Sequence, residues 1–333
     1  MGLMWGDRQA PKHESDPASE PDLYRMMPRL AVIMILLILM LSAQPARAES
    51  QDTLKVSVDL VNVQFSVTDH RGRLIPGLRA EDFSLEEDGK RQEILHFARE
   101  NELPLTIGML IDTSPSVRPV FDEEKETAVS FLESILRPSD LALVIGFDRS
   151  VTLVQDYTER SRLLKAAIDE LAIGGGTSLY DAVYLVCKEK LGREAGRKTI
   201  ILISDGEDTT SKTKFFEALI AAHQSDAVIY SISNSRRGFF LRGNTGGGGG
   251  DPGTLKKFSE ETGGAMFFVD SQNSFQKIFD QIAQELRTQY SLGYISSNHA
   301  RNGKFRQIRI VPRNSNYTVR ARKGYYAPKD PDR

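Results

Sequence analysis

The segment Leu105–Ser116 reads LTIGMLIDTSPS and joins an apolar run to a cluster of oxygen-bearing side chains. Residues 105–111 have the length and composition of a buried β-strand, and Asp112, Ser114 and Ser116 follow directly. In an open parallel sheet the carboxyl ends of the strands converge on one crevice, where ligands bind. This segment therefore predicts a parallel sheet with a polar site at its carboxyl edge.

Two further polar residues stand at comparable corners of the chain. Thr177 follows three glycines and precedes a helical pattern, and Asp205 follows the apolar strand expected at 199–203. Together with Asp112, Ser114 and Ser116 they offer two carboxylates and three hydroxyls, an all-oxygen set that suits a hard cation such as Mg²⁺. Nitrogen and sulfur ligands are absent from the set, which argues against zinc. The residues predict a Mg²⁺ site, with Mn²⁺ or Ca²⁺ as alternative ions.

The order Asp-x-Ser-x-Ser, then Thr, then Asp resembles the metal-ion-dependent adhesion site of von Willebrand factor A domains. The resemblance implies that Ser114 and Ser116 bind the ion directly, and that Thr177 does so once a ligand is bound. It implies direct or water-mediated contacts for Asp112 and Asp205, with a partner's Asp or Glu filling the open position. The alternative for Ser114 and Ser116 is ordinary helix capping.

Three more acidic residues lie close to the motif in sequence. Ser178–Asp181 has the pattern of a helix capping box, so we expect Asp181 to start a helix, with support of the metal ligands as the alternative. Glu207 and Asp208 follow Asp205 and are expected to form a solvated acidic rim.

The stretch from residue 102 to 288 alternates strand and helix patterns. Strands are expected at 105–111, 141–147, 151–154, 199–203, 227–232 and 265–269, and helices at 120–136, 161–172, 178–191, 214–225, 255–262 and 274–286. This alternation predicts an α/β fold, doubly wound, with a mostly parallel six-stranded sheet and helices on both faces. The short turn at 148–150 predicts one antiparallel hairpin in that sheet.

The segments on either side, 49–101 and 289–333, show β periodicity instead. Because the ends of a domain often lie close together, we expect them to pair into one small all-β domain. The order of segments resembles bacterial secreted proteins with a von Willebrand factor A-related domain. The flanking motifs Asp82-Phe83, Glu87–Gly89 and Leu292–Tyr294 carry that part of the resemblance, less specifically than the metal motif.

Residues 1–48 are expected to direct export. The apolar run 30–41 follows basic residues and precedes Ala46-Arg47-Ala48, as in a secretory signal peptide. The alternative is an uncleaved membrane anchor formed by the same run. The prediction is a periplasmic or secreted protein whose only membrane contact would be this segment. The formal net charge of −2 gives no basic excess that would indicate nucleic-acid binding.

These features favour an exported, non-enzymatic protein that grips a protein partner through Mg²⁺. A metal-dependent hydrolase and a purely structural metal site are the alternatives. No Gly-x-Ser-x-Gly elbow occurs, and no Gly-Lys-Ser/Thr follows the glycine run at 246–250, which argues against a triad hydrolase and a P-loop. The single Cys187 is expected to be buried and inert.

Overall fold

The structure is a computed structural model that describes residues 60–99, 103–233 and 250–329. The predicted leader at 1–48, the beginning of the first β segment and most of the glycine run at 246–250 lie outside these residues. Within them, no helix is both long enough and apolar enough to cross a membrane.

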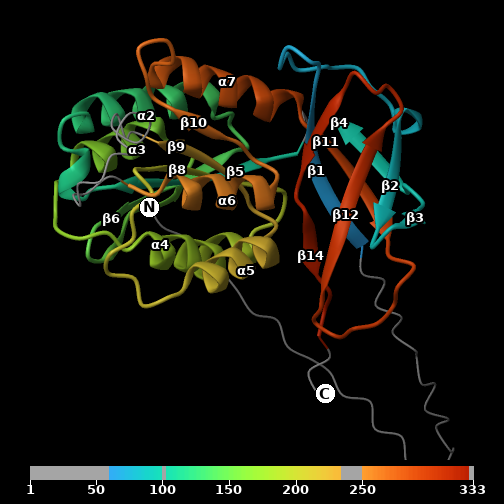
Figure 1. Ribbon diagram of the computed structural model, residues 1–333. Coiled ribbons are helices and arrows are strands. Elements are labelled where there is room, and N and C mark those ends of the chain that lie inside the picture. The colour runs from blue at the N-terminus through green and yellow to red at the C-terminus, as the bar shows by residue number, and fades with distance from the viewer. Residues whose placement is uncertain (1–59, 100–102, 234–249, 330–333) are drawn as a thin grey trace, which may run out of the picture. The chain divides into compact units, whose positions relative to one another are not determined.

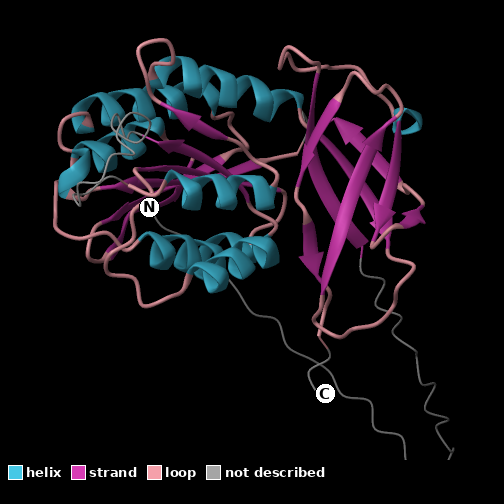
Figure 2. Ribbon diagram, in the orientation of Figure 1, coloured by secondary structure: helices cyan, strands magenta, loops and turns pink. Residues whose placement is uncertain are grey.

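Six strands form the central sheet, in the order β10-β9-β8-β5-β6-β7 (Figures 1 and 2). The strands are β5 (Leu105–Asp112), β6 (Leu141–Phe147), β7 (Val151–Thr158), β8 (Arg197–Ser204), β9 (Val228–Ser233) and β10 (Met266–Phe268). All neighbours are parallel except β6 and β7, which form the antiparallel hairpin predicted at residues 148–150. β5 and β8 are buried at every position, as their apolar composition requires.

Helices cover both faces of this sheet, which confirms the doubly wound α/β fold. One apolar core lies under α2 (Phe121–Ile135), α3 (Ser161–Asp169) and α7 (Phe275–Thr288). The other lies under α4 (Leu179–Leu185), α5 (Phe215–Ser225) and α6 (Pro252–Thr262). Cys187 belongs to the second core and is buried, as expected, in the π-helical turn Val186–Lys190 that continues α4.

The flanking segments form two antiparallel four-stranded sheets, and each sheet contains strands from both ends of the chain. One has the order β13-β1-β11-β4 and the other β14-β12-β2-β3. The strands are β1 (Leu60–Thr68), β2 (Phe83–Glu87), β3 (Lys90–Gln92), β4 (His96–Arg99), β11 (Tyr290–Ile295), β12 (Phe305–Pro312), β13 (Thr318–Ala321) and β14 (Gly324–Tyr326). The predicted all-β domain built from both flanks is confirmed, and we call it the β domain. The exact domain boundaries stay a prediction.

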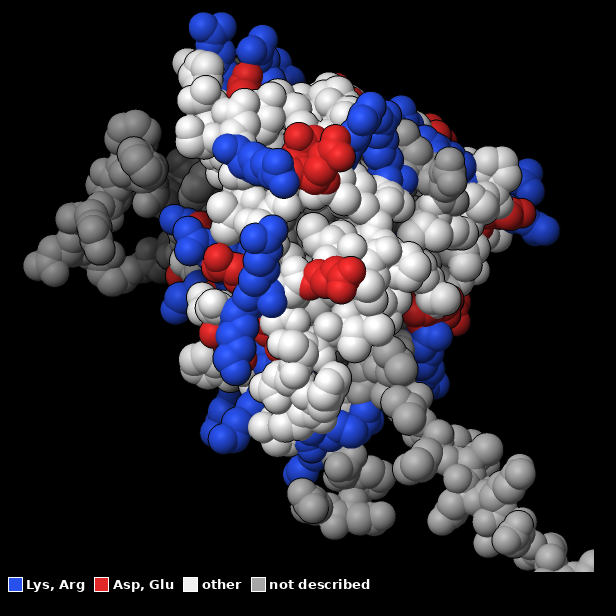
Figure 3. Space-filling view, turned by 90° about the vertical axis from the view of Figure 1, so that its right-hand side faces the viewer, with Lys and Arg blue, Asp and Glu red and all other residues white. Residues whose placement is uncertain are grey.

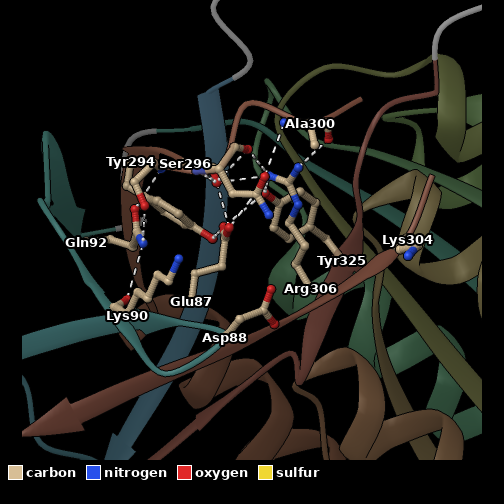
Figure 4. Close-up of polar contacts among 12 residues, drawn as sticks. Glu87, Asp88, Lys90, Gln92, Tyr294, Ser296, Ala300, Lys304, Arg306 and Tyr325 are labelled. Atoms are coloured by element: carbon tan, nitrogen blue, oxygen red, sulfur yellow. Dashed lines mark hydrogen bonds and ion pairs between the residues drawn. The ribbon is translucent and has the colours of Figure 1, made fainter. Parts of the chain in front are cut away.

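A buried polar network joins the two ends of the chain inside the β domain (Figure 4). Glu87 of β2 accepts hydrogen bonds from the hydroxyls of Tyr294 (2.8 Å), Ser296 (2.6 Å) and Tyr325 (3.0 Å). Its carboxylate also lies 3.6 Å from the guanidinium of Arg306, and both side chains are at most 5% exposed. Arg306 in turn donates to the carbonyls of Asn298 and Ala300, which holds the loop between β11 and β12.

The basic side chains of the C-terminal β segment find their acidic partners in other parts of the chain. Residues 286–329 contain ten Lys or Arg and no Asp or Glu, and basic groups are prominent on the face shown in Figure 3. Three of its buried or half-buried arginines pair with distant carboxylates: Arg306 with Glu87, Arg320 with Glu285 and Arg322 with Asp226. These pairs fasten the segment both to β2 and to the α/β domain.

Contacts between the two domains gather at the amino ends of the parallel strands. Glu285, near the end of α7, accepts hydrogen bonds from Ser66 and from Tyr230, each at 2.7 Å. Arg322 donates to Asp226, which follows α5, and to the carbonyl of Asn62 in β1. The β domain thus approaches the α/β sheet from the end opposite the polar site predicted at residue 112.

Candidate metal centre

Asp112 ends β5 and is fully buried. One carboxylate oxygen accepts the backbone N–H of Ser114 at 2.8 Å, and the other accepts the hydroxyl of Ser204 at 2.6 Å. Ser204 ends the neighbouring strand β8, whose Ile203 pairs with Ile111. The sheet register thereby fixes the orientation of this carboxylate. The role of Ser204 was not predicted, because no local sequence motif marks it as a partner of Asp112.

Ser114 and Ser116 lie on the turn that follows Asp112. Their hydroxyl oxygens are 2.9 Å apart, with Ser114 buried and Ser116 exposed. Ser114 precedes the short helix Pro115–Val117, but its side chain makes no capping hydrogen bond to that helix. The capping alternative is therefore wrong for Ser114. Both hydroxyls are held as a pair directly beyond the end of β5.

Thr177 lies on a loop that is tied to its neighbours on two sides. Its N–H donates to the hydroxyl of Thr209 at 2.9 Å, and its carbonyl accepts the N–H groups of Thr209 and Thr210. The preceding glycines bring the loop close to β5 and β6, since the N–H of Gly174 donates to the carbonyl of Thr113 at 2.8 Å. A Cβ on Gly174 would lie 1.7 Å from the carboxylate of Asp148, so any larger residue there would displace that side chain.

Asp205 follows β8 and is 6% exposed. Its carboxylate accepts the N–H of Glu207 at 3.0 Å, and Gly206 adopts a φ of 85° that glycine tolerates best. A Cβ on Gly250 would lie 2.1 Å from the carbonyl of Asp205, so the chain before α6 packs closely against this corner. Nothing in the local sequence marks this role of Gly250.

The acidic residues around the motif act differently from the prediction. The capping box at residues 178–181 is wrong, because the hydroxyl of Ser178 donates to the carbonyl of Arg149 instead of capping α4. The carboxylate of Asp181 accepts the N–H groups of Lys212 (3.0 Å) and Thr213 (2.8 Å). Tertiary hydrogen bonds thus replace the local capping hydrogen bonds that we expected.

Asp208 provides the hydrogen bond at the start of α4 that Ser178 does not make. Its carboxylate accepts the N–H of Tyr180 at 3.1 Å and the hydroxyl of Ser211 at 2.6 Å. Glu207 beside it is half-buried. Asp181 and Asp208 therefore stabilise the loop that holds Thr177, and neither is bonded to Asp112 or Asp205.

The electrostatics of the centre favour a bound cation. Burial raises the pKa of Asp112 to about 6, and the negative charge of Asp205 adds to this rise, while hydrogen bonds from Ser204 and Ser114 oppose it. In the part of the chain that the structure describes, neither carboxylate forms an ion pair with Lys or Arg. Nor do the described residues contain any group of three or more His, Cys, Asp or Glu that could hold a metal. A metal ion at this centre would therefore need the hydroxyls as donors, and such a set suits a hard cation.

Histidines lie elsewhere in the structure. His223 is at the end of α5, near the amino ends of the strands, whereas His70, His96 and His299 belong to the β domain. Among residues 60–99, 103–233 and 250–329, no imidazole therefore stands at the carboxyl edge of the sheet as a general base. The hydrolase alternative gains no support from the structure.

A comparison with sequence models of protein families agrees with this fold. A sequence model of the von Willebrand factor type A domain matches residues 107–281. A search of curated proteins found no match.

Among solved structures, BatB from Bacteroides thetaiotaomicron is 19% identical, with a TM-score of 0.45, over 55% of this chain and 97% of BatB. Proximal thread matrix protein 1 from the mussel byssus, whose MIDAS motif holds zinc, is 17% identical with a TM-score of 0.47. That match covers 61% of this chain and 50% of the mussel protein. The vWF domain of the pilus tip protein Mfa5 from Porphyromonas gingivalis is 13% identical with a TM-score of 0.42, over 55% and 94% of the two chains.

Proposed function

The chain belongs to the von Willebrand factor type A family, and we propose that it is an exported interaction module that binds a protein partner through a divalent cation. One observation supports this more than any other. Asp112 is a fully buried carboxylate beside a second carboxylate, and no cationic side chain within the described residues pairs with either. Burying an unpaired charge is costly, and a bound cation removes that cost.

We assign the ion to Asp112, Ser114, Ser116, Thr177 and Asp205, with Mg²⁺ as the expected ion. When bound, the ion supplies a Lewis-acidic position for an oxygen ligand of the partner. The protein's own contribution is to hold its five side chains in place beforehand. Ser204 and the N–H of Ser114 orient Asp112, and the 209–210 loop orients Thr177.

The charge balance supports a partner that supplies an anionic oxygen ligand. Two carboxylates neutralise a divalent cation without giving the centre an excess of negative charge, so an anionic oxygen ligand can still bind. A partner that presents the side chain of Asp or Glu meets this requirement. The exposed position of Ser116 keeps one side of the centre open to such a ligand.

Export is part of the proposal and rests on residues 1–48. N-terminal sequencing of the processed protein is expected to begin at Glu49. Recovery of the full-length chain in the membrane fraction would instead support an anchor at residues 30–41.

The first experiment measures Mg²⁺ and Mn²⁺ binding by calorimetry. Asp112→Ala and Asp205→Ala are expected to abolish binding, whereas Ser114→Ala weakens it less because a neutral ligand is lost. Asp169→Ala is the matched control, since Asp169 is an exposed carboxylate on α3 that pairs with Lys165. Undiminished binding in both Asp112→Ala and Asp205→Ala would refute the assignment.

The second experiment tests the partner. Proteins retained by the immobilised chain in Mg²⁺ should be released by a chelator and should not bind the Asp205→Ala variant. Partners that stay bound under both conditions, despite loss of the metal, would indicate a structural ion and another binding surface.

A further inference from the structure

A second candidate site lies at the opposite end of the α/β sheet. A cavity of about 210 Å³ lies between β1 of the β domain and the amino ends of β8 and β9. Its lining includes Gln64, Glu194, Lys198, His223, Asp226 and Arg322. The space would hold about seven water molecules, so it suits a ligand much smaller than a nucleotide.

Three polar atoms of the lining are buried without a hydrogen-bond partner in the described part of the chain. They are Oε1 of Gln64, Nδ1 of His223 and Nε of Arg322. The great majority of buried polar groups in folded proteins have a partner, so three unpartnered ones around one cavity indicate an occupant. His223 and Arg322 are only 4% and 8% exposed, and both line the cavity.

The charged side chains of the lining indicate which charged groups the ligand carries. Arg322 is already paired with Asp226, whereas Lys198, which is 9% exposed, forms no ion pair with any residue that the structure describes. Glu194 is a half-buried carboxylate that likewise lacks an ion pair among these residues. The cavity therefore offers one unmatched cation, one unmatched anion and the acceptor oxygen of Gln64. A ligand that carries both charges on a small frame would satisfy all of them.

We propose that this cavity binds a small zwitterionic α-amino acid, with its carboxylate toward Lys198 and its ammonium group toward Glu194 and Gln64. Nδ1 of His223 supplies a further acceptor. Burial and the nearby charge of Arg322 lower the pKa of His223 to about 4, against the opposing effects of Asp226 and of a hydrogen bond to the Gly324 backbone. The imidazole is therefore neutral at pH 7 and leaves one nitrogen able to accept.

The test is calorimetry on the whole exported protein with glycine, L-alanine and L-serine. Binding is expected with a dissociation constant between about 1 μM and 1 mM, since a ligand of this size cannot bind much more tightly. Lactate and ethylamine, which each keep one of the two charged groups, should bind at least about tenfold more weakly, because a charged hydrogen bond contributes at least that much. Equal binding of lactate and alanine would overturn the zwitterion assignment.

Two variants address the two charges separately. Lys198→Met should weaken alanine binding by at least about tenfold, and Lys165→Met, which changes an exposed lysine on α3, should not. Glu194→Gln preserves the size of a half-buried side chain and should not disturb folding. It therefore still tests the proposal if Lys198→Met fails to fold. It should weaken alanine binding and leave lactate binding unchanged.

Hydrogen exchange locates the site and separates it from the metal centre. Alanine should slow exchange at residues 60–68 and 222–228, and it should do so equally in the Asp112→Ala variant. Protection elsewhere, or no binding by any of the three amino acids at about 10 mM, would mean that the cavity holds only water, and the proposal would be withdrawn.

Discussion

Replacing Glu87 by Gln should destabilise the β domain strongly, although the side chain keeps its shape. The carboxylate faces the buried guanidinium of Arg306 at 3.6 Å and accepts three hydroxyl hydrogen bonds. Breaking a buried ion pair on one side costs about 3–5 kcal/mol, since the remaining charge stays buried without its counter-ion. Arg306 keeps its bonds to the carbonyls of Asn298 and Ala300, so we expect about 3 kcal/mol.

The neighbouring residue provides a matched control. Glu86 lies 3.9 Å from Arg309, but its side chain is 34% exposed and that of Arg309 is 73% exposed. An exposed pair contributes about 0–1 kcal/mol, so Glu86→Gln should change the free energy of unfolding by well under 1 kcal/mol. Both substitutions remove one negative charge from the same strand, but only Glu87 is buried and accepts the three hydroxyl hydrogen bonds.

Urea denaturation followed by near-ultraviolet circular dichroism of the tyrosines is the suitable assay. Burial raises the pKa of Tyr294 and Tyr325, so both hydroxyls stay protonated donors across the accessible pH range. A double-mutant cycle with Arg306→Met should show a coupling of about 0.5–3 kcal/mol. Equal effects of Glu87→Gln and Glu86→Gln, or a loss below about 1 kcal/mol for Glu87→Gln, would refute the role of this network.

Three further outcomes follow from the structure. Because the pKa of His223 is lowered to about 4, the unfolded chain takes up a proton between about pH 6.5 and 4 that the folded chain does not. The free energy of unfolding should therefore fall by about 3 kcal/mol as the pH drops through this window, and His223→Gln should remove that part of the slope in urea titrations. Burial raises the pKa of Cys187 to about 12, so a thiol reagent should label it only upon unfolding; rapid labelling of the native protein would contradict its burial. Gly174→Ala should weaken Mg²⁺ binding about tenfold by displacing Asp148, whereas Gly175→Ala, whose Cβ would meet nothing within 4 Å, should leave the affinity unchanged.

The architecture was largely predictable because it depends on local periodicity. Alternating strand and helix patterns indicated the doubly wound domain, and the five oxygen-bearing residues stood directly at strand ends or on a glycine loop. The burial of Asp112 and Thr177 and the pairing of the Ser114 and Ser116 hydroxyls are consistent with that expectation. Formation of the parallel sheet is enough to bring side chains at the carboxyl ends of its strands to the same edge.

The supporting contacts were not predictable, because they depend on register and on competing partners. Ser204 reaches Asp112 only through the alignment of β5 with β8. Ser178 and Asp181 match a capping box, yet their side chains form other hydrogen bonds. The hydroxyl of Ser178 donates to the carbonyl of Arg149, and the carboxylate of Asp181 accepts the backbone N–H groups of residues 212–213. A local motif predicts the bond that a segment can make alone, and tertiary neighbours decide which bond it makes.

The topology explains why the β domain and the metal centre lie at opposite ends of the sheet. The chain enters the α/β domain at the amino end of β5 and leaves it after α7, which returns toward the amino ends as helices of such folds do. Arg197, at the start of β8, donates to the carbonyl of Leu286 and to Gln289, so the exit lies beside the first residues of a central strand. A domain assembled from both flanks must therefore sit at the amino edge. The same connectivity that makes the β domain a single unit keeps it away from the carboxyl edge, where Asp112, Thr177 and Asp205 stand.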